Sequence, residues 1–332
     1  MSSARFFIIT GMLRSGTTLV QQTLNACPGM QCSYQDSTGL FTRIKSDFLK
    51  TRNLHPYHIL STLFPADPHP EQLTAYLHQQ DFIKQLISEH SSGPIQGYKE
   101  VLMEEFIPYL LRYLRVILVI RNPKDVISSM HYGNFEQYSG SHRPVLFDIR
   151  NWRKSAAFAI YVRRHPRFLL LHYEDLVCQF DETISKVLRF LGRPVTDIPD
   201  TLPARLRHNS SFAQDAEGVF TNSVNQYRYT LDSELEQYIE QLCFPEMQAL
   251  GYPCHMTLNQ WKENRYYYIQ EPFPISRPEF TDFDAVGESE KERARHLLLQ
   301  SNNCSDQDQL RKSYIYPEIF EKLHLSLQYI KI

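Results

Sequence analysis

The sequence predicts an α/β protein in which a mainly parallel sheet lies between two layers of helices. Continuous apolar runs at 6–9, 115–120 and 167–172 are typical of strands that are buried on both faces. Helical patterns alternate with these runs, which favours parallel strand pairing. With 332 residues, 42% of them hydrophobic, the chain is long enough for one large domain with an appendage or for two smaller domains.

The turn after the first strand has the composition of a phosphate-binding loop. Gly11 and Gly16 have four residues between them, and a helical pattern follows over 18–24. This spacing lets the backbone curl its N–H groups around an anion at a helix N-terminus. Nucleotide triphosphate loops carry lysine and then serine or threonine after the second glycine, whereas here Thr17-Thr18 follows and Arg14 supplies the positive charge. The loop therefore suits transfer of a group other than a magnesium-bound γ-phosphate.

A second strand end carries another anion-binding pattern. The run 115–120 leads into Arg121-Asn-Pro-Lys-Asp125, where Pro123 is well placed as the first residue of a helix. Arg121 then stands at the end of the strand, and Ser129 stands within the first turns of the helix. An arginine fork and a serine hydroxyl can together hold a second phosphate.

The remaining elements continue the alternation of strands and helices. In order, the sequence predicts a helical pattern over 73–88, an extended segment ending at 97–100, helices over 106–113 and from 123, a loop over 133–146, a helix over 152–164, a strand over 167–172, and helices over 182–191 and 231–250. Gly192 and Gly251 are typical C-terminal glycines of the last two helices. Ligands of such sheets bind at the carboxyl ends of the strands, where Arg14, Arg121 and Tyr173 stand.

These motifs resemble the sulfotransferases that use 3′-phosphoadenosine-5′-phosphosulfate (PAPS). Arg14-Ser-Gly-Thr-Thr18 is similar to the 5′-phosphosulfate loop of that family, and Arg121 to Asp125 with Ser129 is similar to its 3′-phosphate motif. Two further motifs follow in the family's order, namely Tyr173-Glu-Asp-Leu176 with Phe190-Leu-Gly192, and Asn209-Ser-Ser-Phe212 with Ser223–Arg228. The resemblance implies a sulfotransferase-like P-loop fold with a sulfotransferase domain over 1–252. Residues 253–332 are then expected to be a C-terminal extension, an extended arm with one or two short helices, that packs on the core or covers the acceptor site.

The resemblance also implies an activity and its site residues. The protein would transfer a sulfuryl group from PAPS to a hydroxyl or amine and release PAP, with Arg14 neutralising the leaving oxygen. Arg121 and Ser129 would hold the 3′-phosphate. The other implied cofactor contacts are Ser15, Gly16, Thr17, Thr18, Ser223, Arg228 and, at the adenine, Tyr173. The acceptor stays open among small metabolites, glycans, lipids and peptides.

Two positions depart from relatives. The cytosolic sulfotransferases have lysine at the position of Arg14, whereas tyrosylprotein and many bacterial sulfotransferases have arginine, so this chain sides with the latter. Near the last motif those relatives carry a basic residue before an aromatic one, but this chain has Gln226-Tyr227. Arg228 is the residue that could substitute. A catalytically silent PAP(S)-binding protein is therefore an alternative interpretation, and a P-loop kinase is a weaker one because Thr17 stands where lysine should be.

The general base must accept the proton of the acceptor, which requires a carboxylate or histidine near the loop. In tyrosylprotein sulfotransferases a glutamate serves, and Gln35 takes its position here with Asp36 beside it. In cytosolic sulfotransferases a histidine shortly after a lysine serves, and the matching region here contains Lys99 and Glu100. Asp36 is favoured slightly over Glu100, and His131 is the third candidate.

Composition argues against several other classes. The formal net charge of −2 gives no general attraction to nucleic acid or anionic membranes. The six cysteines form no Cys-x-x-Cys pair, and the histidines form no His-Glu-x-x-His motif, so no metal site is predicted. The loop begins at residue 11, which leaves no room for a signal peptide, and no apolar run approaches the roughly 20 residues of a membrane span. We therefore expect a soluble, cytoplasmic protein; the sequence does not indicate its oligomeric state.

Overall fold

The computed structural model of the protein describes residues 6–33, 39–53, 70–89, 95–133, 143–195, 221–263, 271, 275–276, 280, 283–301, 309–310, 313–314 and 316–328. These residues form two compact units. Unit 1 contains the described residues within 1–58, 70–121 and 162–224, and unit 2 contains those within 122–161 and 225–332. Two of the crossings from unit 1 to unit 2 follow Arg121 and Val224.

Unit 1 is built on a five-stranded parallel sheet in the order β2-β3-β1-β4-β5. Its strands are β1 (Phe6–Thr10), β2 (Met30–Ser33), β3 (Ile95–Lys99), β4 (Arg115–Ile120) and β5 (Phe168–His172). In the central strand β1, Ile9 pairs with Lys99 of β3 and with Ile117 of β4. All residues of β1 are buried, which explains its uninterrupted apolar sequence. The predicted parallel α/β fold is confirmed.

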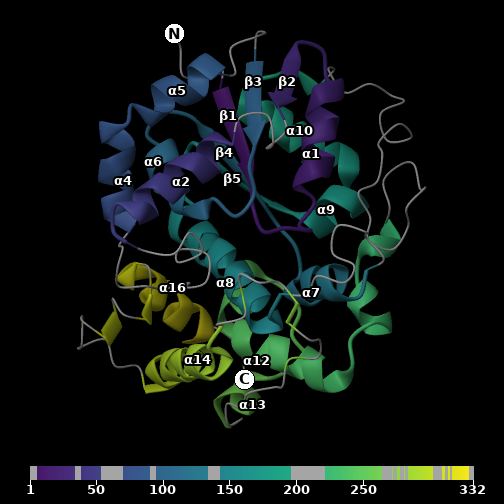
Figure 1. Ribbon diagram of the computed structural model, residues 1–332. Coiled ribbons are helices and arrows are strands. Elements are labelled where there is room, and N and C mark those ends of the chain that lie inside the picture. The colour runs from purple at the N-terminus through teal and green to yellow at the C-terminus, as the bar shows by residue number, and fades with distance from the viewer. Residues whose placement is uncertain are drawn as a thin grey trace. The chain divides into compact units, whose positions relative to one another are not determined.

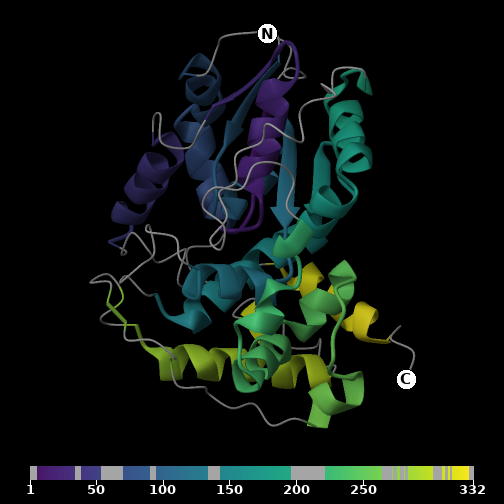
Figure 2. The same ribbon diagram turned by 90° about the vertical axis from the view of Figure 1, so that its right-hand side faces the viewer.

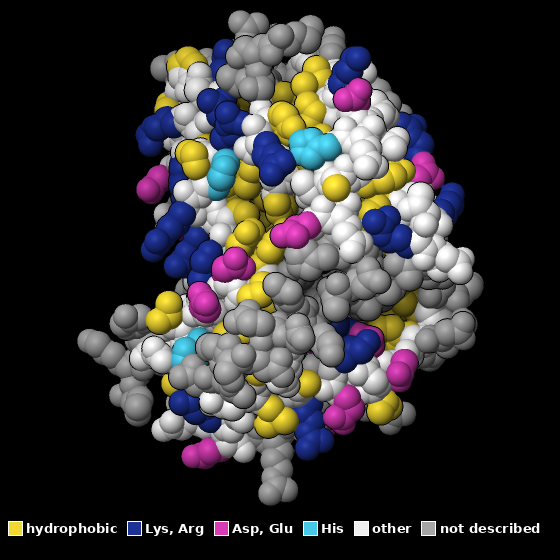
Figure 3. Space-filling view, turned by 90° about the vertical axis from the view of Figure 1, so that its left-hand side faces the viewer, with side chains coloured by type: hydrophobic (Ala, Val, Ile, Leu, Met, Phe, Trp, Pro, Cys, Tyr) yellow, Lys and Arg dark blue, Asp and Glu magenta, His cyan; other side chains and the backbone are white. Residues whose placement is uncertain are grey.

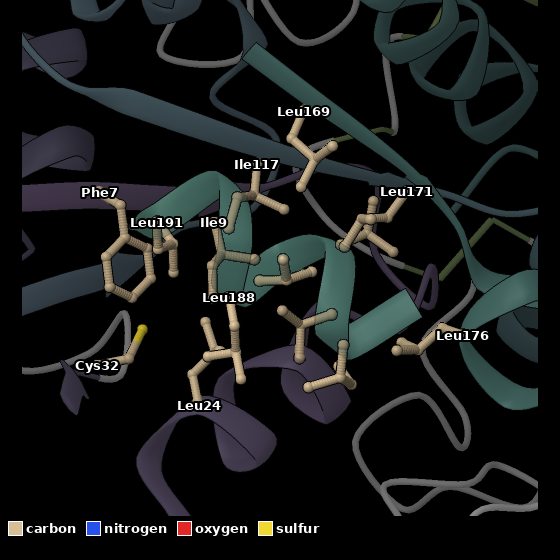
Figure 4. Packing of buried hydrophobic residues seen from close by; sticks show 14 of the residues in the cluster. Phe7, Ile9, Leu24, Cys32, Ile117, Leu169, Leu171, Leu176, Leu188 and Leu191 are labelled. Atoms are coloured by element: carbon tan, nitrogen blue, oxygen red, sulfur yellow. The ribbon is translucent and has the colours of Figure 1, made fainter. Parts of the chain in front are cut away.

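The helices α1 (Thr17–Ala26), α9 (Tyr173–Cys178) and α10 (Phe180–Leu191) lie on one side of this sheet (Figure 1). Figure 4 shows Phe7 and Ile9 of β1 on the same face as Leu24 of α1 and Leu188 of α10, all within one buried cluster. Burial of each such side chain contributes about 1.5–3 kcal/mol. Gly97 of β3 makes room for this packing, since a Cβ atom there would lie 2.2 Å from the Phe7 ring.

The other side of the sheet is covered by an aromatic layer. Its helices are α2 (Leu40–Lys50), α4 (Pro70–Gln79), α5 (Phe82–Glu89) and α6 (Ile107–Leu110), with the short helix η3 (Glu104–Phe106) (Figure 1). Tyr98 of β3 stacks on Phe41 of α2 with ring centroids 5.4 Å apart, and Phe41 also meets Phe82 and Phe106, each at 5.1 Å. The sheet therefore lies between two helical layers, as predicted.

Two helix boundaries differ from the predicted ones. The helical pattern over 73–88 is two helices, because Asp81 adopts a left-handed conformation (φ 48°) between α4 and α5, and aspartate tolerates that conformation better than most residues. The helix predicted to start at 152 is α8 (Val145–Val162) and begins seven residues earlier. Its first N–H groups, those of Val145 and Leu146, are bound by the Glu271 carboxylate. Because Glu271 is more than a hundred residues away in the sequence, the residues around 145 give no sign that a helix begins there.

Unit 2 is helical in its described part. It contains α7 (Pro123–His131), most of α8, η6 (Gln226–Tyr229), α12 (Ser233–Leu250), α13 (Leu258–Glu263), α14 (Ala285–Ser301) and α16 (Pro317–Gln328). The last three helices lie beyond residue 252 and exceed the one or two short helices expected there. Figure 2 shows α14 as one continuous helix in yellow-green. Trp261 of α13 stacks on Phe244 of α12 at 5.6 Å.

A network of buried charges joins α8, α12 and α14. Its members are Arg150, Arg153, Glu246, Glu288, Glu292 and Arg295. Glu292 is central, because it pairs with all three arginines, at 2.8 Å to Arg150 Nε. Burial would raise the pKa of Glu292, but the charges of Arg153, Arg295 and Arg150 outweigh it and lower that pKa to about 2. Burial lowers the pKa of Arg150 to about 9.

The surface of unit 1 carries mixed charges. In the view of Figure 3, Lys and Arg side chains in its upper half are interspersed with hydrophobic, acidic and histidine side chains, without gathering into one basic stripe among the side chains described. As for membranes, none of the helices in the described ranges has both the length and the apolar character that a bilayer span requires.

Candidate active site

The loop between β1 and α1 has a backbone shape that depends on its glycines. Gly11 (φ 144°) and Gly16 (φ 95°) both have positive φ, and so does Arg14 (φ 65°) between them. A Cβ atom on Gly11 would lie 2.2 Å from the carbonyl oxygen of Val119 in β4, so only glycine fits there. Arg14 takes up a conformation that few non-glycine residues adopt, which is a feature of functional loops.

The loop ends at the N-terminus of α1. Gly16 is the N-cap, no side chain among the described residues caps the helix, and its first turn contains no acidic residue. The N–H groups at a helix N-terminus and the helix dipole together favour an anion. The loop therefore has the backbone features of an anion site, and its binding of a phosphate stays a prediction.

Hydroxyl groups of the loop add to this cradle. Ser15 is fully buried, and its Oγ has no hydrogen-bond partner among the described residues. A buried hydroxyl without a partner costs about 1–3 kcal/mol, which a bound oxyanion would relieve. The hydroxyl of Thr18 accepts a hydrogen bond from Lys99 Nζ at 3.2 Å.

Lys99 is a loop contact that the sequence analysis did not include among the site residues. It is the last residue of β3 and is 2% exposed. Parallel pairing brings it beside the loop, because the Glu100 N–H donates to Ile9 O at 3.0 Å and the Leu102 N–H donates to Gly11 O at 3.2 Å. Its position at the carboxyl end of a strand next to β1 was the signal that could have identified it.

Glu100 follows directly and is also buried, with 6% of its surface exposed. Its Oε2 accepts a hydrogen bond from the Tyr98 hydroxyl at 3.3 Å. The other candidate base, Asp36, and its neighbour Gln35 lie outside the described residues.

Arg121, at the end of β4, contacts both the loop and a later segment. Its Nη1 donates to Arg14 O at 3.1 Å, and its Nη2 donates to Ser223 O. The guanidinium also lies over the Tyr173 ring, 4.5 Å from its centroid. Tyr173 in turn shares a hydrogen bond of 2.6 Å with Ser223 Oγ. Unit 1 therefore brings Arg121, Tyr173 and Ser223 together with the loop.

The residues that follow Arg121 in this motif belong to unit 2, where they cap α7 and bind a neighbouring segment. The Asn122 side chain caps α7 by accepting from the Lys124 N–H at 3.0 Å. Asp125 accepts from the N–H groups of Asn225 and Tyr227, at 2.8 and 3.0 Å. Ser129 is buried in the same helix. Its predicted role beside Arg121, which belongs to unit 1, stays a prediction.

Two other candidates also belong to unit 2. Arg228 is exposed and donates to the Tyr227 hydroxyl at 3.5 Å, a hydrogen bond that raises the pKa of Arg228. His131 is buried on α7, and its Nε2 lies 2.9 Å from Asp148 Oδ2. Of the predicted motifs, 209–212 lies outside the described residues.

A comparison with known protein families matches the part of the chain that contains these motifs. A family model described as the sulfotransferase domain matches residues 5–251. The chain belongs to the sulfotransferase domain family. That match spans the loop, Arg121, Ser129 and Tyr173, whereas α13, α14 and α16 of this sulfotransferase lie beyond it.

The chain is also similar to several solved structures that include sulfotransferases. The chain is similar to the sulfotransferase domain of the curacin biosynthetic pathway, with 15% identity and a TM-score of 0.45 over 74% of this chain and 97% of that one. It is similar to the sulfotransferase domain of the Synechococcus PCC 7002 olefin synthase, with 16% identity and a TM-score of 0.46 over 75% of this chain and 95% of that one. It is similar to a mouse sulfotransferase complexed with PAP, with 13% identity and a TM-score of 0.45 over 74% of this chain and 84% of that one. The comparison with curated proteins gave no match.

Proposed function

We propose that this sulfotransferase transfers the sulfuryl group of PAPS to a hydroxyl or amine of an acceptor and releases PAP. The observation that carries the proposal is the cradle at the start of α1. There, a helix N-terminus adjoins the buried hydroxyl of Ser15, and within the part of the chain that the structure describes neither has a side-chain partner. Such a site fits a compact, phosphate-like oxyanion.

The residues of the loop would bind the 5′-phosphosulfate end. Arg14 supplies a fixed positive charge, and Ser15, Gly16, Thr17 and Thr18 supply N–H or hydroxyl donors. Lys99 adds a second positive charge next to Thr18. In a sulfuryl transfer the charge develops on the oxygen of the leaving group, where cations and oriented donors stabilise it most. PAPS supplies the reactive sulfuryl group, and the chain supplies position and charge.

A second set of donors would bind the 3′-phosphate, which distinguishes PAP from AMP. We assign Arg121, Ser129 and Ser223 to this set, with Arg228 as a further contact. Arginine suits this task because its planar fork can hold two oxygens of one phosphate at once. The 3′-phosphate then determines which nucleotide is accepted.

The acceptor must lose a proton when it attacks. Asp36 or Glu100 would take that proton as a carboxylate. For Glu100, the support is its position directly after Lys99, which contacts the loop. For Asp36, the support is its place next to the position of the catalytic glutamate in the tyrosylprotein sulfotransferases.

The proposal is tested in two steps. Thermal unfolding is first measured with PAP and with AMP, because a ligand stabilises a protein according to its affinity for the folded state. PAP should raise the unfolding temperature much more than AMP, and equal effects would contradict the assignment of a 3′-phosphate site. The protein is then incubated with sulfur-labelled PAPS and a broad cell extract. A labelled product supports an active enzyme, whereas PAP binding without any product would leave a silent PAP-binding protein.

A further inference from the structure

Asp125 ends the Arg121–Asp125 motif, and the proposed function leaves it without a role. It lies in the first turn of α7 and is 1% exposed. Its Oδ2 accepts from the Asn225 N–H at 2.8 Å, and its Oδ1 accepts from the Tyr227 N–H at 3.0 Å. Donors of this kind compensate a buried carboxylate for the water that it loses. One side chain therefore joins two of the predicted motifs, since Asp125 and Asn225 are 100 positions apart in the sequence.

The segment that Asp125 binds depends on outside support for its shape. The short helix η6 (Gln226–Tyr229) has four residues, too few to be stable on its own. Asn225, its N-cap residue, is left-handed with a φ of 62°, and its side chain makes no capping hydrogen bond to the described residues. A capping side chain normally accepts from the second or third N–H of a helix. Here the Asp125 carboxylate accepts from the second, that of Tyr227, and so caps η6 from another helix.

Two further contacts hold η6 and the residue after it against α7. Ser128 Oγ and Thr230 Oγ1 share a hydrogen bond of 2.7 Å. Lys124 Nζ lies 5.1 Å from the centroid of the Tyr227 ring, within the range of a cation–π contact. The first two turns of α7 therefore form a platform for η6.

Arg228 extends from this short helix. Its side chain is exposed, its Nε donates to the Tyr227 hydroxyl at 3.5 Å, and its guanidinium carbon lies 5.9 Å from the centroid of that ring. Tyr227 is 3% exposed and is held at its N–H by Asp125. Asp125 and Ser129 are four residues apart and share a face of α7. Asp125 therefore fixes the backbone from which Arg228 extends, on the face of α7 that carries Ser129.

We propose that Asp125 is a positioning residue for the 3′-phosphate, because it holds η6 on α7 and so sets where the Arg228 guanidinium meets an anion. The inference rests on the proposed function, which assigns Arg228 and Ser129 to the 3′-phosphate of PAPS. A carboxylate repels a phosphate and does not bind it directly. Its effect is to reduce the conformational freedom that Arg228 and its backbone lose on binding. Asp125 thereby sets the preference for PAP over AMP.

The first test measures the affinities for PAP and for AMP by titration calorimetry. Asp125→Asn keeps the size of the side chain but replaces one acceptor oxygen with an NH2 group, so one N–H of the turn loses its acceptor. PAP affinity should fall about tenfold, the effect of one misplaced charged contact, while AMP affinity should change less than about twofold. An equal loss for both nucleotides would overturn the inference.

The matched control for this test is Glu292→Gln. It makes the same chemical change at another buried carboxylate of unit 2, whose described ion pairs are with arginines of α8 and α14. It should lower stability and leave the ratio of the PAP and AMP affinities unchanged. A change of that ratio as large as in Asp125→Asn would reduce the effect to general destabilisation and overturn the inference.

The second test is a double-mutant cycle that asks whether Asp125 acts through Arg228. Arg228→Ala alone should weaken PAP binding about tenfold. In the Arg228→Ala background, Asp125→Asn should then add less than about a twofold loss, because the residue that it positions is gone. A silent Arg228→Ala, or two losses that multiply, would overturn the inference.

Hydrogen exchange without nucleotide separates this inference from the proposed function. Peptides that cover 225–230 should exchange about tenfold faster in Asp125→Asn and should be unchanged in Glu292→Gln. If the parent protein binds PAP but this exchange is unchanged in Asp125→Asn, the inference fails alone. If the parent protein does not bind PAP, the proposed function fails and the inference falls with it.

Discussion

Two pairs of buried cations, one beside the loop of unit 1 and one inside unit 2, have different kinds of described partner. In unit 1, the hydrogen bonds described for Lys99 and Arg121 go to a hydroxyl and to backbone carbonyls. In unit 2, Arg150 and Arg153 are paired with the carboxylates of Glu246, Glu288 and Glu292. Carboxylate partners neutralise a cation, whereas carbonyls and hydroxyls orient it without cancelling its charge.

The difference shows how one chain uses the same residue types for two purposes. A neutralised arginine inside a helical layer fixes how helices pack, and its removal leaves a buried charge without compensation. A cation that lies beside a helix N-terminus adds to the positive potential that attracts an anion. The following predictions should separate these purposes, because changes at the loop should alter chemistry and changes in the network should alter stability.

The largest effect is expected for the base. If Asp36 accepts the acceptor proton, Asp36→Asn should lower the turnover rate by about two to four orders of magnitude while PAP affinity is unchanged. The acid limb of the pH–rate profile should disappear with it. Glu100→Gln is the matched variant, and an inactive Glu100→Gln beside a nearly normal Asp36→Asn would assign the base to Glu100. If neither variant loses activity on an acceptor that needs deprotonation, His131 is tested next.

In the network, Glu292→Gln should lower the free energy of unfolding by about 3–5 kcal/mol, because three arginines lose their shared carboxylate. Denaturant unfolding measures this effect. The control is Glu290→Gln on the same helix, since Glu290 is exposed and the ion pair described for it is a surface pair with Arg293. A change of less than about 1 kcal/mol is expected there. An effect as small as that of the control would contradict a structural role for the network.

The Glu292 contribution should also depend on pH. The pKa of Glu292 is lowered from 4.5 to about 2 in the folded protein. A carboxyl group whose pKa is lower in the folded state stabilises the protein above its unfolded pKa and loses that effect as protons bind. The stability difference between the parent and Glu292→Gln should therefore be complete above pH 4.5 and shrink as the pH falls toward 2.

At the loop, Arg14→Ala should reduce the single-turnover rate by about a hundredfold or more, because its charge matters most when the leaving oxygen becomes anionic. PAP affinity should fall much less, and thermal stability should stay close to that of the parent. Arg189→Ala on the exposed face of α10 serves as the control for loss of an arginine. A rate within a few-fold of the parent would make Arg14 a binding or structural residue only.

The smallest effect concerns the hydroxyl that orients Lys99. Thr18→Val removes the acceptor of the 3.2 Å hydrogen bond from Lys99 Nζ. PAP affinity measured by calorimetry should fall about three- to tenfold, the equivalent of one hydrogen bond. Thr18→Ser, which retains the hydroxyl, should behave like the parent. If valine and serine have the same effect, the hydroxyl does not orient Lys99 for binding.

Local sequence signals predicted most of unit 1. The apolar runs identified β1, β4 and β5 because strands buried on both faces have no polar positions. The glycines of the loop were informative for a related reason, since only glycine fits the approach of Gly11 to Val119 O. These features depend on residues that are near one another in the sequence.

Other features required contacts between distant residues. The start of α8 depends on the Glu271 side chain, more than a hundred positions later. Lys99 reaches the loop through strand pairing with β1, and the arginine network joins three helices from separate parts of the chain. The sequence motif placed Tyr173 near the nucleotide, but its contacts with Gly16 and Arg121 appear only in the folded structure.

The central position of β1 has a consequence for synthesis of the chain. β1 leaves the ribosome well before its partner strands, which pair with it at Gly97 and Val116. At about 5–20 residues per second, on the order of ten seconds pass before they emerge. During that interval the backbone N–H and C=O groups on both edges of β1 have no strand partners, and such long-range pairing is slow to form. The loop that follows β1 packs against Val119 of β4 and therefore acquires its shape only after β4 has been synthesised.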